Sequence, residues 1–151
     1  MRPCAQSDTA RAGTFGLKPA ILENKVVYVD MNDCPAQLDI LAHVDVVSAG
    51  DGWSVTEPFV PLLRDGKLYG RGTCDDKGPA VAALYAMRAV RELNIPLKYN
   101  VRLILGADEE TGCRDTDCYY SHFKEAPCSY SPDGEYPVIN LEKGGLGCYE
   151  Q

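Results

Sequence analysis

The spacing of apolar positions changes along the chain, and the change separates predicted strands from predicted helices. Short β-branched or wholly apolar runs at residues 26–31, 38–47 and 99–106 predict strands. The run at 38–47 is apolar enough to predict a strand that is buried on both faces of a sheet. Residues 67–73 follow an Asp-Gly turn signal and predict a short strand that leads into a loop.

Helical spacing appears between these runs. Residues 77–94 are rich in Ala, Leu and Met and predict the longest helix, with Pro79 in its first turn. A second helix is predicted around 115–124 and a last strand at 137–141, whereas the mixed residues before the first strand predict no element. Strands that alternate with helices predict an α/β fold with a largely parallel sheet.

Composition narrows the function. The chain has 151 residues, 45% of them hydrophobic and 25% charged, which is typical of one globular domain. A net charge of −7 without a basic stretch argues against a nucleic-acid partner or an anionic membrane surface. No apolar run is long enough to predict a membrane-spanning helix. The 7 cysteines form no C-x-x-C pair, which argues against a zinc finger and favours reduced thiols in the cytoplasm.

Ionisable residues gather where the predicted strands end, which is where open α/β sheets bind ligands. His43 and Asp45 are two apart in a strand and therefore project from the same face. Such a pair suits a metal-binding histidine with a carboxylate that orients it. A buried histidine that is simply satisfied by its neighbouring aspartate is the alternative explanation.

Two further acidic groups have both a structural and a chemical explanation. Asp75 and Asp76 precede the long helix, and one of the two carboxylates could cap it. Two adjacent carboxylates repel each other, so the pair calls for a cation such as Lys77 or a metal. Residues 108–110 are three successive acids that form either a solvated loop or a site held by a divalent cation. The cation would leave one glutamate free as a general base. Asp133, in a Pro-Asp-Gly turn, is by itself more typical of a structural residue.

Together these groups are more informative than any one of them. One histidine and several carboxylates at successive strand ends predict a hydrolytic zinc site, because mixed His, Asp and Glu ligands suit zinc. The excess of carboxylates favours two metal ions that share a bridging aspartate, about 3.5–4 Å apart.

Four motifs in these regions resemble the signatures of the M20 metallopeptidases, in the family's order. They are residues 41–47, 70–79, 106–112 and 131–137. The likeness is greatest to the dipeptidase branch, of the kind that cleaves Xaa-His dipeptides, and loop residues 50–53 and 65–69 share it. The resemblance implies a zinc-aminopeptidase-like three-layer α/β sandwich that hydrolyses dipeptides or short peptides.

The resemblance also implies ligands for two divalent metal ions, Zn²⁺ first, with Mn²⁺ or Co²⁺ as alternatives. His43 and Asp133 would bind the first ion, and Glu110 would bind the second. Asp75, rather than Asp76, would bridge the two ions.

Two roles beyond metal binding follow from the same resemblance. Glu109 would be the general base, and Asp45 would lie beside His43 and tune the site. The peptide bond between Asp75 and Asp76 would be cis.

The chain also departs from the family. No histidine follows His122, so the family's later second-metal histidine has no counterpart, and neither do its lid domain or its helices before Val26. We therefore expect residues 1–151 to be a partial catalytic domain of a larger peptidase, with little activity alone. Another M20 hydrolase, such as an acylamino-acid deacylase, and a non-catalytic metal-binding or partner-binding module are the alternatives. The sequence leaves open the preferred dipeptide, the native metal and the oligomeric state.

Overall fold

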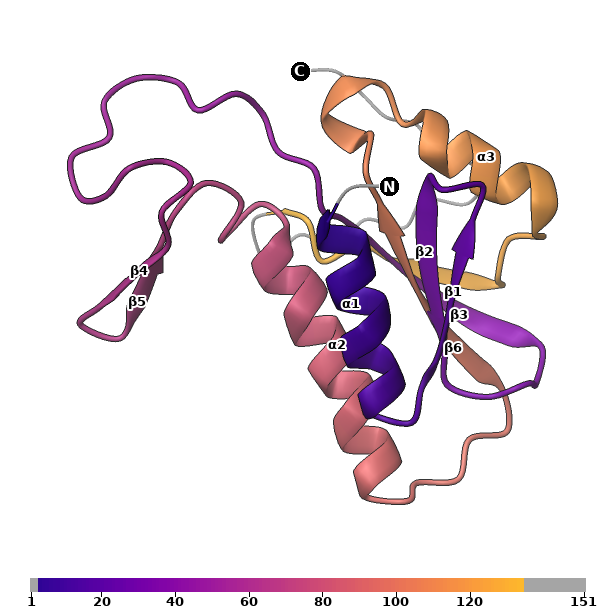
Figure 1. The fold of residues 1–151 in the computed structure, drawn as a ribbon. Helices are drawn as coiled ribbons and strands as arrows, with labels where there is room; N and C mark the ends of the chain where they lie inside the picture. The colour runs from indigo at the N-terminus through magenta and orange to yellow at the C-terminus, as the bar shows by residue number, and fades with distance from the viewer. Residues whose placement is uncertain (1–2, 135–151) are drawn as a thin grey trace.

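The computed structural model describes residues 3–134 and is built on a five-stranded sheet of order β1-β2-β6-β3-β7 (Figure 1). The strands span Lys18–Leu22 (β1), Val26–Asp30 (β2), Ala36–His43 (β3), Asn100–Gly106 (β6) and Cys128–Tyr130 (β7). β3 runs parallel to β6 and β7, whereas β1 and β2 pair antiparallel with their neighbours. The predicted α/β fold is confirmed, and its sheet is mixed.

Helices cover both faces of this sheet (Figure 1). α1 (Pro3–Thr14) and α2 (Lys77–Glu92) lie on one face, and α3 (Arg114–His122) lies on the other. An apolar core lies on each face of the sheet. Successive strand residues contribute to the two cores alternately, because side chains alternate across a strand. Val27 packs with the α1 and α2 side, and Val26 packs with Tyr119 of α3. The result is the three-layer arrangement that the resemblance implied.

A small hairpin extends away from this body (Figure 1). It consists of β4 (Leu62–Arg64) and β5 (Lys67–Tyr69), which pair only with each other. The hairpin follows the long irregular segment that leaves β3 after His43. Within residues 3–134 no lid domain is present.

The sequence-based elements near the chain start need correction. No helix was expected before Val26, and α1 is there. It was missed because its sequence is only weakly amphipathic, and among its described residues Ala12 alone is fully buried. β3 ends at His43 rather than at residue 47, because its partner β6 ends opposite it at Gly106. The strand expected at 137–141 lies outside the described residues.

The cysteines are not all reduced. Cys34, Cys74, Cys118 and Cys128 are free thiols. Cys113 is disulfide-bonded, so the expectation of reduced thiols throughout is wrong at this position. No short cysteine motif in the sequence marks this bond.

A largely buried ion pair ties the sheet to α3. The Arg102 guanidinium donates to both carboxylate oxygens of Asp30, at 2.6 and 2.8 Å, and to the Tyr119 hydroxyl at 2.8 Å. The rings of Tyr28 and Phe123 lie over the same guanidinium, 4.8 and 4.7 Å from their centroids. Each of the three guanidinium nitrogens therefore donates a hydrogen bond on the α3 side of the sheet.

We expect the substitution Arg102→Ala to lower the free energy of unfolding by about 3–5 kcal/mol, because it leaves the largely buried Asp30 carboxylate without its cation. Urea denaturation measures the change. Arg88→Ala is the matched control, since Arg88 pairs with Glu92 on the exposed side of α2. Equal unfolding midpoints for the two variants would contradict the structural importance of the buried pair.

Among the described residues, no helix is both long enough and apolar enough to cross a membrane.

Candidate metal centre

The site is built around His43, the last residue of β3, whose side chain is almost completely buried. Its Nε2 atom lies 2.9 Å from Asp75 Oδ1, 3.3 Å from Asp133 Oδ2 and 3.9 Å from Glu109 Oε2. These carboxylates come from the loop before α2, the loop after β7 and the loop after β6. The structure therefore brings together one imidazole nitrogen and carboxylates from three separate loops.

Asp45 lies on the opposite edge of the imidazole ring. Its Oδ1 atom is 3.3 Å from His43 Nδ1. The same carboxylate accepts the backbone N–H groups of Glu109 and Glu110, at 3.4 and 3.2 Å. Asp45 thus fixes the loop that carries both glutamates relative to the histidine. The sequence predicted its nearness to His43 but gave no sign of this contact with the backbone.

The adjacent residues Asp75 and Asp76 contact different parts of His43. Asp75 faces His43 Nε2 and its side chain is 62% exposed. Asp76 is fully buried, and its Oδ2 atom accepts the backbone N–H of His43 at 3.1 Å. The bond between them is cis, as the resemblance implied.

Neither simple explanation of the aspartate pair fits the structure. Asp76 occupies the N-cap position of α2 but makes no capping hydrogen bond with its side chain. In the described part of the chain, no ion pair joins Lys77 to either aspartate. Asp76 Oδ1 is buried without a hydrogen-bond partner. Burial raises the pKa of Asp76 to about 6, which shows how poorly this negative charge is compensated by protein groups alone.

The three successive acids after β6 also have different partners. Asp108 is neutralised by Arg114, whose Nε and Nη2 atoms donate to it at 2.7 and 2.8 Å, and this pair holds the pKa of Asp108 well below its usual range. Glu110 Oε1 accepts the backbone N–H of Val47 at 3.2 Å. Ligand atoms of Glu109, Glu110 and His43 all lie within 4.8 Å of one another. Only the last two acids of the run therefore face the histidine.

Asp115 positions this acidic loop, a role that was not predicted from the sequence. The residue is buried in the first turn of α3, and its Oδ2 atom accepts the backbone N–H groups of Ala107 and Asp108. Gly106 leaves room for this contact, because a Cβ atom there would lie 2.5 Å from Asp115 Oδ2. The pairing of a glycine at the strand end with an acid eight or nine residues later was the available signal.

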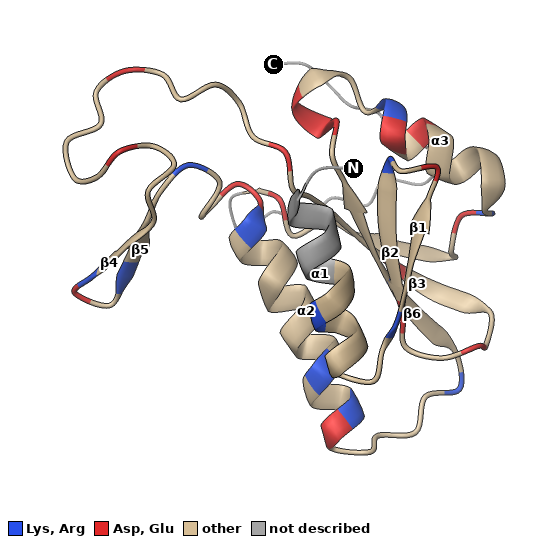
Figure 2. Cartoon of the chain, in the orientation of Figure 1, with Lys and Arg blue, Asp and Glu red and all other residues tan. Residues whose placement is uncertain are grey.

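The electrostatics of the site favour a cation. Burial alone would lower the pKa of His43, but Asp133, Glu109, Asp45 and Asp76 together raise it. Burial raises the pKa of Glu109, and the neighbouring carboxylates raise it further. Figure 2 shows acidic residues, in red, in the loops after β3 and β6 and at the start of α2. The donor set of one imidazole nitrogen and several carboxylate oxygens suits a divalent metal such as zinc.

His122 is not part of this site. It is the last residue of α3 and belongs to a separate group with Glu23 and Cys118.

A small cavity of about 100 Å³ adjoins the His43 site and is lined by Glu109, Asp133 and Ser131, among others. Asp45, Asp75, Glu109, Glu110 and Asp133 thus each place a carboxylate oxygen within 4.8 Å of a His43 ring nitrogen, while their individual roles stay predictions.

Comparison with known proteins identifies the family. Residues 40–140 match the model of peptidase family M20/M25/M40, which is more than half of the chain. The chain belongs to this family. The match contains every residue of the His43 site, from His43 itself to Asp133.

Bacterial relatives carry dipeptidase names. The chain is 45% identical over 107 residues to a Bacillus subtilis protein named "Putative dipeptidase YtjP", and 44% identical over 107 residues to a Staphylococcus epidermidis protein named "Putative dipeptidase". Each match covers 71% of this chain and 23% of the relative. The chain therefore spans about a quarter of the length of these relatives.

Solved structures share the fold. Human carnosine dipeptidase 1 aligns with a TM-score of 0.71 at 25% identity, over 87% of this chain and 32% of that one. An M20 family metallo-carboxypeptidase from Sulfolobus solfataricus also aligns with a TM-score of 0.71 at 25% identity, over 84% of this chain and 31% of that one. The three-layer sandwich is thus an M20 catalytic-domain fold.

We expect Asp115→Ala to lower the free energy of unfolding by about 1.5–3 kcal/mol, because two backbone N–H groups lose a charged acceptor. Asp117→Ala, an exposed aspartate in the same helix turn, is the matched control and should change stability little. Urea denaturation compares the two. If both variants unfold alike, Asp115 does not anchor the acidic loop.

Proposed function

We propose that this chain is the catalytic portion of a metal-dependent dipeptidase, which hydrolyses the peptide bond of dipeptides or short peptides. The observation that carries the proposal is the cluster at His43 Nε2, where Asp75 and Asp133 lie at 2.9 and 3.3 Å. Membership of a peptidase family and the dipeptidase names of the bacterial relatives support the substrate class.

The proposed ligands fall into two sets. By resemblance to the family, His43, Asp75 and Asp133 would hold one divalent ion, and Asp75 and Glu110 would hold a second. The structure supports the choice with two clusters of potential ligand atoms around His43, one with Asp76 and Asp133 and one with Glu109 and Glu110. Zn²⁺ is the first candidate and Mn²⁺ or Co²⁺ the alternatives. When bound, such ions polarise the scissile carbonyl and lower the pKa of a water molecule. Asp76 would stay on the His43 backbone N–H and fix the end of β3, which leaves the more exposed Asp75 to bridge.

Glu109 is the proposed general base. Its side chain is 45% exposed and therefore reachable by substrate, and its carboxylate lies 3.9 Å from His43 Nε2. Burial beside other acids raises the pKa of Glu109, which brings it closer to a working pH and suits a proton carrier. Glu109 would take a proton from water and deliver it to the leaving amine. Asp45 would keep this loop and the imidazole in register.

Three finer assignments are part of the proposal. An Xaa-His preference, a partial catalytic domain over residues 1–151 and a cytoplasmic location stay predictions. The free thiols support the location and the Cys113 disulfide does not. An acylamino-acid deacylase is the second candidate activity, and the names of the relatives favour a dipeptidase over it. A non-catalytic metal-binding fragment is the third.

Metal binding gives the first test. We expect the 151-residue chain to bind one ion tightly at the His43 site and the second weakly, because the second has only Asp75 and Glu110 as ligands within this sequence. Calorimetric titration with Zn²⁺ in a Cys118→Ser background, which disables the separate group of Glu23, Cys118 and His122, measures both steps, and Asp133→Ala should abolish the tight one. Two equally tight ions that both survive Asp133→Ala would contradict this ligand assignment.

Removal of the base gives the second test. We expect the chain to hydrolyse dipeptides slowly and Glu109→Gln to lower that rate about 10²–10⁴-fold, since general-base catalysis contributes about this much. Metal affinity should remain, because Glu109 is not a proposed ligand. Glu125→Gln, on an exposed loop, is the control. Release of free amino acid with added Zn²⁺ or Mn²⁺ measures the rate, and equal rates for both variants would exclude Glu109 as the base.

A further inference from the structure

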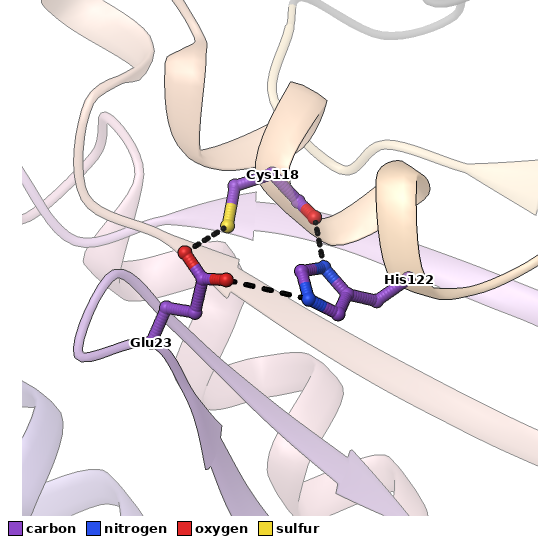
Figure 3. Close-up of side chains that lie close together, drawn as sticks. All are labelled: Glu23, Cys118 and His122. Carbon is purple, nitrogen blue, oxygen red and sulfur yellow. Dashed lines mark hydrogen bonds and ion pairs between the residues drawn. The ribbon is translucent and has the colours of Figure 1, made fainter.

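A second group of potential ligands lies away from His43, where the β1–β2 turn meets α3 (Figure 3). Glu23 comes from the turn, and Cys118 and His122 come from successive turns of α3. Cys118 Sγ lies 3.4 Å from one carboxylate oxygen of Glu23, and His122 Nε2 lies 3.3 Å from the other. One sulfur, one nitrogen and one oxygen thus come within 4.8 Å of one another.

The hydrogen bonds of His122 determine which of its ring nitrogens is free. Nδ1 lies 2.9 Å from the backbone carbonyl oxygen of Cys118, which can only accept. The Ser121 hydroxyl donates to the same carbonyl at 2.7 Å and therefore offers a lone pair to Nδ1, which is 3.0 Å away. In the neutral ring Nδ1 must therefore carry the hydrogen. Nε2 of that ring is a lone-pair donor aimed at Glu23, the arrangement that metal-binding histidines adopt.

We propose that Glu23, Cys118 and His122 form a further metal site, which takes Zn²⁺ or a similar thiophilic divalent cation. Thiolate, imidazole and carboxylate are the three side-chain ligand types of zinc. On binding, the Cys118 thiol gives its proton to water, and its sulfur bonds to the metal. Three protein ligands leave a fourth position open to solvent, because Glu23 and His122 are both partly exposed.

One cation of the protein competes for this site. Lys25 Nζ lies 3.3 Å from the Glu23 oxygen that also contacts Cys118. The Lys25 side chain is 55% exposed, so it can move into solvent at little cost when a divalent ion arrives. Among the described residues, Glu23 is the one ion-pair partner of this lysine, whereas a metal ion would engage all three side chains.

A metal ion here would join elements that lie far apart in the sequence. Glu23 lies between the first two strands, and α3 directly follows the acidic loop of the His43 site. The ion would therefore link the β1–β2 turn to α3. The first turn of α3 carries Asp115, which anchors the acidic loop of the His43 site. This site shares no residue with the His43 site, so its existence does not depend on the proposed peptidase activity.

Cobalt absorption distinguishes this site from the catalytic one. Co²⁺ bound by a thiolate gives a charge-transfer band in the near ultraviolet, and the ligands proposed around His43 include no cysteine. We expect the 151-residue chain to develop this band on titration with Co²⁺ and to lose it when Zn²⁺ is added. Cys118→Ser should abolish the band, while Cys34→Ser and Cys74→Ser, which alter two other free thiols, should keep it.

His122→Asn provides a second variant at a partly exposed position. It should raise the apparent dissociation constant for Co²⁺ at least about tenfold, as loss of groups that support a metal commonly does. Circular dichroism spectra that match the parent would show that each variant is folded. No band in the parent chain, or an equal band in Cys118→Ser, would overturn the proposal.

Discussion

The parallel pairing of β3 with β6 is the constraint on which the site depends. The register places His43 directly opposite Gly106, so both strands end at the same edge of the sheet. A histidine at the end of one strand and an acidic loop at the end of the other are thereby neighbours, although some sixty residues separate them in the sequence. Both strands are held in the sheet by cores on either side, so the edge is supported by the whole three-layer body.

Carboxylates around this edge serve two different purposes. Asp45, Asp76 and Asp115 are buried and accept backbone N–H groups, which fixes the loops. Asp75 and Asp133 are more exposed and face the imidazole nitrogen. The buried set costs desolvation, which hydrogen bonds offset in part. The exposed set concentrates negative charge where an ion can enter. The buried carboxylates therefore hold the loops in place, and the more exposed carboxylates are available to bind a metal.

The sequence predicted the strands and helices near the site well, because their apolar spacing is regular and β-branched residues mark the strands. Resemblance to the family motifs also predicted that His43 and Asp133 would meet. Weakly patterned elements escaped prediction: α1 buries little apolar surface, and β7 has only three residues. Tertiary anchors such as Asp115 escaped as well, because an acid in a first helical turn ordinarily suggests only a favourable helix dipole.

The claim that the His43 cluster is a metal centre is tested most directly by locating the ion. A crystal of the 151-residue chain grown with Zn²⁺ can be measured at the zinc absorption edge. We expect an anomalous peak about 2.0–2.2 Å from His43 Nε2, with carboxylate oxygens of Asp75 and Asp133 at similar distances. Zinc bound elsewhere on the chain, with no peak at His43 in crystals saturated with the ion, would contradict it.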